Sequence, residues 1–268
     1  MLEEIRCLLL DLDGTVYIGG QLIPGALRLR DVSASRGIDV FFLTNNSSRS
    51  VESYSSKITA MGWPVTVDRV LSSSQATAGV LKKRGVKKVY VVGTSSLAEE
   101  LDRQGLIVCG DDEANVDHVV VGFDTSLTYN KLQTAARHLR KGTPMISTNP
   151  DLVCPIENDE FIPDCAAISA CLMTACGVRT EYVGKPEHGM LELVEANTPY
   201  RGKQIAMVGD RLYTDVKFAA NWGLLSVLVL SGETKREDIT ADDRPDLVLD
   251  DVGQLADMID RAHAGRNA

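Results

Sequence analysis

Two aspartates near the N-terminus, Asp11 and Asp13, are spaced so that both could do chemistry at one site. They follow the apolar run 7–10 and precede Gly14. A short apolar run that ends at turn residues indicates a buried strand of a parallel sheet, and ligands of such sheets bind just beyond the carboxyl ends of the strands. Carboxylates this close repel each other unless a cation neutralises them or one keeps a proton. The pair therefore suggests a cation site, and a strand that ends in a polar turn is the plainer alternative.

Three further polar clusters follow predicted strands or turns, and each alone is typical of an ordinary turn or helix cap. They are Thr44 with Asn45, Lys185 in a Gly-Lys-Pro turn, and Asp210 with Asp215. Together they supply carboxylates for a hard cation, a hydroxyl and an ammonium. This set suits phosphoryl transfer, because acids can hold Mg²⁺, Thr44 and Lys185 can neutralise phosphoryl oxygens, and a carboxylate can act as nucleophile.

The elements that must position these residues alternate between strands and helices. Strands are predicted over 7–10, 38–43, 70–71, 88–92, 106–108, 118–121, 145–147, 204–208, 225–230 and 245–249, with a hairpin over 16–23 that turns at Gly19-Gly20. Helices are predicted over 26–35, 50–61, 75–84, 96–104, 129–140, 164–176, 186–197, from Asp215 to 222, and 253–262. Such alternation indicates an α/β fold with a mostly parallel sheet and right-handed crossovers.

Composition narrows the function classes. The chain has 268 residues and a net charge of −9 with no basic run, which argues against a nucleic-acid partner. Its apolar runs are far shorter than a membrane span, and the acidic N-terminus is unlike a signal peptide. The six cysteines form no Cys-x-x-Cys pair, so we expect reduced, buried thiols in a cytoplasmic protein rather than disulfides or zinc.

The motifs, taken in order, resemble the four motifs of the haloacid dehalogenase (HAD) superfamily. They are Asp11-Leu12-Asp13-Gly14-Thr15, Thr44, Lys185, and Gly209-Asp210 followed by Asp215. Asp13 favours the phosphatase branch, because the dehalogenases proper lack an acid two residues after the nucleophile. Three segments are similar to motifs of subfamily IIA, the NagD-like, p-nitrophenylphosphatase-type proteins. They are Leu-Thr-Asn-Asn-Ser, Thr-Asn-Pro-Asp and Tyr-Val-Gly-Lys-Pro.

This resemblance implies roles for the acids. Asp11 would be the nucleophile and a Mg²⁺ ligand. Asp13 would be the general acid and base, and would bind the metal through its backbone carbonyl. Asp210 would be the second side-chain ligand, and Asp215 would support the metal site or orient Lys185.

The resemblance also assigns phosphate binding to Thr44 and Lys185, with Asn45 nearby. The implied activity is Mg²⁺-dependent hydrolysis of small phosphate monoesters through an aspartyl-phosphate, and sugar phosphates, nucleotides and similar esters all remain open as substrates. Alternatives are a phosphomutase, a phospho-receiver signalling domain and an inactive binding protein. Mutases of this superfamily carry their cap between the first two motifs, where this chain has no room, and receivers are about half as long.

The stretch between Thr44 and Lys185 is far longer than one crossover needs, so it should contain an inserted domain. We predict a HAD core over 1–79 and 180–268 and a cap over 80–179. The resemblance implies a Rossmann-like core, a C2-type α/β cap that shapes substrate choice, and a homodimer through the cap.

Some polar residues of the predicted cap could face the substrate, although loop capping is the plainer role for each. They are Thr148, Asn149, Asp151 and Asp164. His188 could be catalytic, but a residue in the first turn of a helix is the plainer interpretation. The Ala- and Cys-rich helix over 164–176 is expected to serve packing rather than thiol chemistry.

Overall fold

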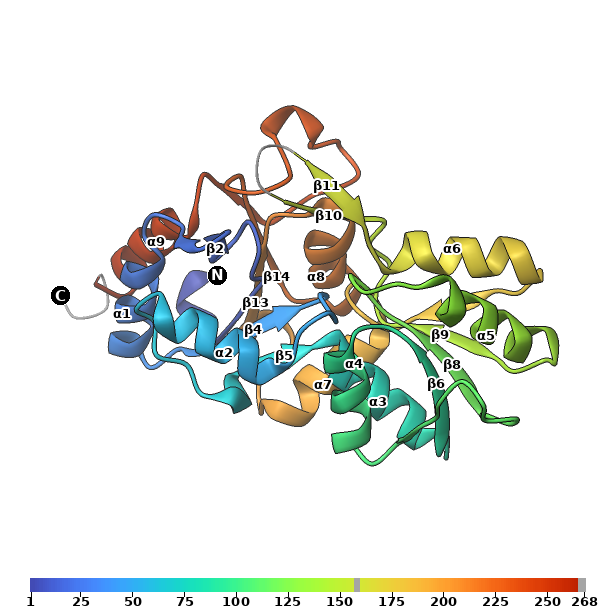
Figure 1. Cartoon of the computed structure of the whole chain (residues 1–268). Coiled ribbons are helices and arrows are strands. Elements are labelled where there is room, and N and C mark those ends of the chain that lie inside the picture. The colour runs from blue at the N-terminus through green and yellow to red at the C-terminus, as the bar shows by residue number, and fades with distance from the viewer. Residues whose placement is uncertain (157–159, 265–268) are drawn as a thin grey trace. The chain divides into compact units, whose positions relative to one another are not determined.

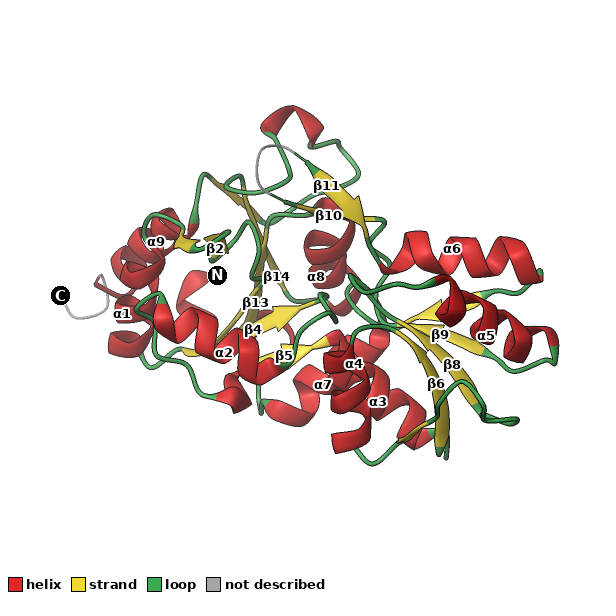
Figure 2. Ribbon diagram, viewed as in Figure 1, coloured by secondary structure: helices red, strands yellow, loops and turns green. Residues whose placement is uncertain are grey.

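The computed structural model describes residues 1–156 and 160–264 (Figure 1). The chain divides into two compact units, Met1–Leu43 with Tyr54–Leu71 and Val194–Ala268, and Thr44–Ser53 with Ser72–Leu193. Figure 2 shows that each unit has strands flanked by helices, which confirms the predicted α/β class. The second unit includes residues 44–53, and the core and cap boundaries given above stay a prediction.

Within the described residues, the first unit has a six-stranded sheet in the order β15-β14-β13-β1-β4-β5. Its strands are β1 (Cys7–Leu10), β4 (Asp39–Thr44), β5 (Val70–Ser72), β13 (Ile205–Gly209), β14 (Leu225–Val229) and β15 (Leu247–Leu249). The pairings β1–β4, β1–β13, β13–β14 and β14–β15 are parallel. β1 and β13 are buried along their whole length because their apolar runs are covered on both faces.

The helices that belong to this sheet begin and end close to where the sequence predicts. They are α1 (Ala26–Arg36), α2 (Val51–Ala60), α8 (Lys217–Trp222) and α9 (Val252–Ala264), with a π-helical turn η4 (Leu212–Val216) before α8. α1 and α9 pack together, and ion pairs join Arg28 to Asp257 and Arg36 to Asp260. The predicted hairpin is present as β2 (Tyr17–Ile18) and β3 (Gln21–Leu22). Short 3-10 turns lie at Leu2–Glu4, Val67–Arg69, Gly202–Gln204 and Arg236–Asp238.

In the second unit, the described residues form a parallel sheet of five strands in the order β12-β9-β8-β6-β7. These are β6 (Lys88–Val92), β7 (Ile107–Val108), β8 (His118–Val121), β9 (Met145–Ser147) and β12 (Thr180–Tyr182). Its helices are α3 (Ser73–Lys83), α4 (Ser95–Arg103), α5 (Tyr129–Arg140), α6 (Cys165–Cys176) and α7 (His188–Asn197). α5 and α6 lie side by side in Figure 1, and their apolar residues form one core with β6, β8 and β9.

Hydroxyl and carboxylate side chains cap four helices of this unit. The side chains of Ser72, Thr94, Thr128 and Asp164 accept hydrogen bonds from the first turns of α3, α4, α5 and α6. Such caps satisfy amide groups that have no partner inside the helix. Loop capping was the plainer interpretation of Asp164, and its contact with the Cys165 amide confirms it.

One hairpin was not predicted. β10 (Val153–Pro155) pairs antiparallel with β11 (Phe161–Pro163), and each strand contains a proline. Proline lacks the amide hydrogen that a ladder needs, so a run that contains it does not read as a strand. Residues 157–159, which connect the two strands in sequence, lie outside the described residues. Every helix in the described part is too short or too polar to cross a lipid bilayer.

The six cysteines all fall in the described ranges and are free thiols. Burial raises the pKa of the Cys7 thiol to about 12 and that of Cys165 to about 11, so neither forms the reactive thiolate near neutral pH. Cys171 is exposed on α6.

We expect iodoacetamide at pH 8 to alkylate Cys171 in the folded protein, while Cys7 and Cys165 react only after unfolding. Peptide mass mapping with and without guanidinium measures this order, and the denatured sample is the control for intrinsic reactivity. Equal alkylation of Cys165 and Cys171 in the folded protein would contradict the assigned burial.

Candidate functional site

The first part of the site comes from the pairing of β1 with β13. Leu10 is in register with Val208, and the Asp11 amide donates to the Val208 carbonyl at 2.9 Å. Asp210 directly follows the end of β13 at Gly209. Because parallel strands end at the same edge of a sheet, this register brings Asp11 and Asp210 together, as the sequence predicts.

A third acid, Asp215, joins them from the π-helical turn η4. Its Oδ2 accepts a hydrogen bond from the Arg211 amide at 3.1 Å. Carboxylate oxygens of Asp11, Asp210 and Asp215 all lie within 4.8 Å of one another. A π-turn inside a helix often occurs at functional sites, and here it places Asp215 beside the strand ends.

Asp210 has an unfavourable environment for a charge. Burial raises the pKa of its carboxyl to about 8, the negative charges of Asp11 and Asp215 add to this, and Arg211 opposes it. Its Oδ2 accepts from the Glu233 amide at 2.7 Å. Its Oδ1 is buried and has no hydrogen-bond partner among the described residues.

These features fit a divalent cation. An acceptor oxygen that is buried without a donor is costly, and a bound cation would satisfy it. The donor set consists of carboxylate oxygens, which suit a hard ion such as Mg²⁺ better than Zn²⁺.

Two glycines pack directly on the Asp210 carboxylate. A Cβ added to Gly14 would lie 2.5 Å from Asp210 Oδ2, and one added to Gly232 would lie 2.0 Å from the same atom. Gly14 also has a φ of +84°, which an L side chain rarely adopts. Its carbonyl accepts from Ser231 Oγ at 2.7 Å. The sequence suggests only the sharp turn at Gly14, and the close approach of Asp210 is a second reason for glycine there.

Asp13 lies at the base of the β2–β3 hairpin rather than among the grouped acids. It is exposed and bridges to Tyr17, and the Gly14 amide donates to the Tyr17 carbonyl at 2.9 Å. Tyr17 is itself buried, and the Lys57 ammonium lies 3.7 Å from its ring centroid. The hairpin therefore has a fixed base, and Asp13 is part of it.

The predicted phosphate-binding residues belong to the second unit. Asn45 Oδ1 accepts from the Lys185 amide at 2.7 Å, and Asn45 Nδ2 donates to the Lys185 carbonyl at 3.0 Å. Thr44 ends β4, and its hydroxyl accepts from the Asn46 amide at 3.1 Å. Lys185 is only 1% exposed. The structure thus brings Asn45 and Lys185 into direct contact, although they lie 140 positions apart in sequence.

The polar residues considered for substrate contact are buried and bonded to one another. Thr148 Oγ1 donates to Asn149 Oδ1 at 2.8 Å, and Asn149 Nδ2 donates to Asp151 Oδ2 at 2.9 Å and to Asp164 Oδ1 at 3.2 Å. Ser47 Oγ shares a hydrogen bond with Thr148 at 2.9 Å. Sequence reasoning missed Ser47, because a lone serine in a polar loop has no local signal.

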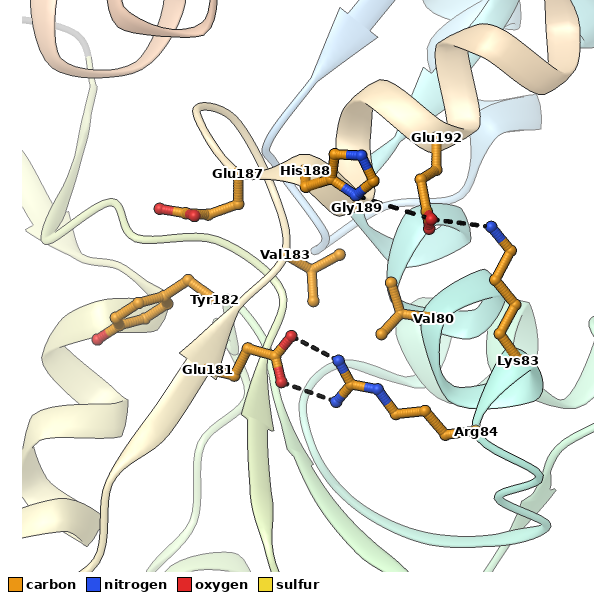
Figure 3. Close-up of a pocket in the computed structure, with 10 residues that line it drawn as sticks. All are labelled: Val80, Lys83, Arg84, Glu181, Tyr182, Val183, Glu187, His188, Gly189 and Glu192. Atoms are coloured by element: carbon orange, nitrogen blue, oxygen red, sulfur yellow. Dashed lines mark hydrogen bonds and ion pairs between the residues drawn. The ribbon is translucent and has the colours of Figure 1, made fainter. Parts of the chain in front are cut away.

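His188 lies apart from these groups, at a pocket of about 340 Å³ in the second unit (Figure 3). It is the first residue of α7, as the plainer interpretation expected, and pairs with Glu192 at 3.7 Å. Glu192 also pairs with Lys83 at 3.0 Å, and Arg84 binds Glu181 through two 2.7 Å contacts. The charged side chains at this pocket thus include two ion-paired cations, Lys83 and Arg84, and a third carboxylate, Glu187.

Comparison with known proteins gives the family. Residues 8–107 match the haloacid dehalogenase-like hydrolases, and residues 182–255 match the HAD-hydrolase-like family. The chain is 33% identical to a 5'-nucleotidase, YutF, of Bacillus subtilis over 246 residues, which cover 91% of this chain and 94% of the relative. It is 35% identical to an acid sugar phosphatase of Staphylococcus saprophyticus over 243 residues, 89% and 91% of the two chains.

A solved structure of a 4-nitrophenylphosphatase from Thermotoga maritima is 37% identical and superposes with a TM-score of 0.90, covering 96% of this chain and 98% of the other. Fold, acid cluster and matches together define a phosphoric monoester hydrolase. The chain belongs to the haloacid dehalogenase-like hydrolases, in the NagD-like, p-nitrophenylphosphatase-type branch that its motifs predict.

The packing on Asp210 leads to a stability prediction. Gly14→Ala should lower the free energy of unfolding by about 1–3 kcal/mol, because the backbone is strained and the new Cβ collides with Asp210. Gly20→Ala is the matched control, since a Cβ there meets nothing within 4 Å, and it should change stability by less than about 0.5 kcal/mol. Denaturant unfolding measures both, and equal midpoints would show that Gly14 is not constrained as described.

Proposed function

We propose that this protein is a Mg²⁺-dependent phosphatase that hydrolyses small phosphate monoesters, such as sugar phosphates or nucleotides, through a phosphorylated Asp11. The observation that carries the proposal is the acid cluster with the orphaned Oδ1 of Asp210. Mutual repulsion makes this cluster costly in a metal-free protein, so its presence favours a metal-binding role.

Side-chain oxygens of Asp11 and Asp210 and the backbone carbonyl of Asp13 would hold the Mg²⁺. Asp215 would keep this site in place, since it already accepts from the Arg211 amide. When bound, the ion supplies positive charge that lets an anionic nucleophile approach an anionic ester.

The covalent steps fall to this chain's own side chains. A carboxylate oxygen of Asp11 forms a bond to phosphorus, and the bond from phosphorus to the ester oxygen breaks. Asp13 gives its proton to the departing oxygen. Water then attacks the phosphorus of the phosphorylated Asp11, Asp13 takes the proton of that water, and the Asp11 carboxylate is restored with release of phosphate.

Phosphate binding is assigned to Thr44, Asn45 and Lys185. The Thr44 hydroxyl would donate to a non-bridging oxygen, and the Lys185 ammonium would neutralise charge. An ammonium on a side chain that is 1% exposed acts strongly on anions, because little water screens it.

The remaining parts of the proposal concern organisation. Residues 1–79 and 180–268 would act as the core and residues 80–179 as a substrate-selecting cap, with a homodimer formed through that cap. Six free thiols suit a cytoplasmic setting.

A phosphomutase remains the alternative enzyme, and it would require transfer of the phosphoryl group back to the substrate instead of to water.

The metal site predicts a specific pattern of thermal stability. Mg²⁺ should raise the melting temperature of the wild-type protein after EDTA treatment, because it binds the folded state. Asp210→Asn should remove this increase, yet melt no lower than wild type in EDTA, because the variant lacks a carboxylate that burial and its neighbours disfavour.

Asp31→Asn, at an exposed acid on α1, is the control and should keep the Mg²⁺ effect. Activity on p-nitrophenyl phosphate should disappear in EDTA and return with Mg²⁺. Full activity after exhaustive chelation would refute the metal requirement.

Asp13→Asn should separate the two half-reactions. A nitrophenolate leaves without a proton, whereas an alkyl oxygen needs one, and acid–base assistance is typically worth about 10²–10⁴ in rate. The variant should release a burst of nitrophenol and then stall as phosphoenzyme, while alkyl esters react poorly from the start.

Rapid-mixing absorbance and intact mass of the trapped adduct measure this behaviour. Asp11→Asn is the control and should give neither burst nor adduct. Equal losses on both ester types without a burst would assign Asp13 a structural role instead.

A further inference from the structure

We infer that Asp151 is a positioning residue, which fixes the Asn45 side chain and thereby the main chain of Lys185. The effect on phosphate binding rests on the proposed function, whereas the positioning itself does not. All residues in the argument belong to the second unit.

The Asn45 side chain binds Lys185 as a neighbouring backbone segment would. Its Oδ1 accepts from the Lys185 amide at 2.7 Å, and its Nδ2 donates to the Lys185 carbonyl at 3.0 Å. This pairing works in only one of the two orientations of the amide, because a flip would oppose donor to donor and acceptor to acceptor.

Asp151 selects that orientation. The second hydrogen of Asn45 Nδ2 goes to Asp151 Oδ2 at 2.8 Å. Oδ2 of Asp151 accepts from two amide groups, Asn45 Nδ2 and Asn149 Nδ2, so an Asn45 amide turned the other way would set its carbonyl oxygen against this acceptor. Asp151 therefore keeps Oδ1 of Asn45 directed at the Lys185 amide.

Asp151 is itself anchored. The same Oδ2 accepts from Asn149 Nδ2 at 2.9 Å, and its backbone carbonyl accepts from the Ala166 amide at 2.9 Å. Asn149 reaches on to Asp164, the cap of α6. A continuous set of hydrogen bonds thus leads from the start of α6 to the Lys185 backbone.

Burial makes these bonds consequential. Asn149, Asp151 and Lys185 are at most 1% exposed, and Asn45 is 7% exposed. Water cannot replace a lost partner at such depth, so each unmade bond carries a desolvation cost. Gly184, next to Lys185, is also tightly packed, because a Cβ there would lie 2.6 Å from Asn45 Oδ1 and 2.8 Å from the Thr148 carbonyl.

The consequence for function is pre-organisation. If Lys185 binds the phosphoryl group, a clamped backbone limits the freedom that its long side chain must lose on binding. Loss of the Asp151 acceptor should therefore weaken phosphate binding even though Asp151 itself need not touch phosphate.

Asp151→Ala tests the positioning directly. With selective ¹⁵N-lysine labelling, the Lys185 amide should exchange with solvent roughly tenfold faster than in wild type, because its acceptor Asn45 is no longer held. Competition by inorganic phosphate against p-nitrophenyl phosphate should weaken by a similar factor. Asp151→Asn should restore most of both, because its carbonyl oxygen can accept from both amide groups.

Asp124→Ala is the matched control. Asp124 is a second buried acid of the same unit, with an ion pair to Lys131 at 2.8 Å and no role in this set of contacts. It should lower the melting temperature while Lys185 exchange and phosphate competition stay at the wild-type values.

Unchanged exchange of the Lys185 amide in Asp151→Ala would overturn the inference. Faster exchange with unchanged phosphate competition would support the positioning and refute its contribution to phosphate binding. If Asp151→Ala does not fold, Asp151→Ser takes its place, because the shorter hydroxyl cannot reach both amide groups.

Discussion

The repulsion among Asp11, Asp210 and Asp215 is the constraint on which the first unit depends. Strand register and the π-helical turn impose it, since the pairing of β1 with β13 fixes Asp11 and Asp210 at one edge and η4 places Asp215 beside them. The Glu233 amide and the Arg211 charge offset part of the cost but leave one Asp210 oxygen without a donor. Folded proteins keep electrostatic repulsion of this kind mainly at functional sites, where the charge is needed.

Close backbone packing then keeps the acids from separating. Gly14 and Gly232, from two segments far apart in the sequence, pack closely against the Asp210 carboxylate. This carboxylate therefore has little room to move away from Asp11 and Asp215. The cluster is therefore held by shape as well as by hydrogen bonds. Acids that are fixed in place before anything binds are a feature of pre-organised sites.

The sequence predicts what depends on local pattern. Apolar runs that end in polar residues predict β1 and β13, and the acids that follow these runs are predicted to lie at neighbouring strand ends. The sequence does not predict the β10–β11 hairpin, because Pro155 and Pro163 are unfavourable in strands. The contact of Asn45 with Asp151 is not predicted for another reason. It joins two loops 106 positions apart, and side chains in loops show no periodicity that would predict a partner.

The buried polar contacts of the second unit show why a folded enzyme does not simply maximise apolar packing. An apolar side chain in place of Asp151 would avoid the desolvation of a carboxylate, yet it would leave Asn45 free to turn its amide. Of the two orientations of the Asn45 amide, only one makes both hydrogen bonds to the Lys185 backbone. Because every hydrogen bond around Asp151 is made in one orientation of the Asn45 amide, the other orientation is disfavoured. These polar residues therefore specify a single geometry, whereas an apolar core would contribute only stability.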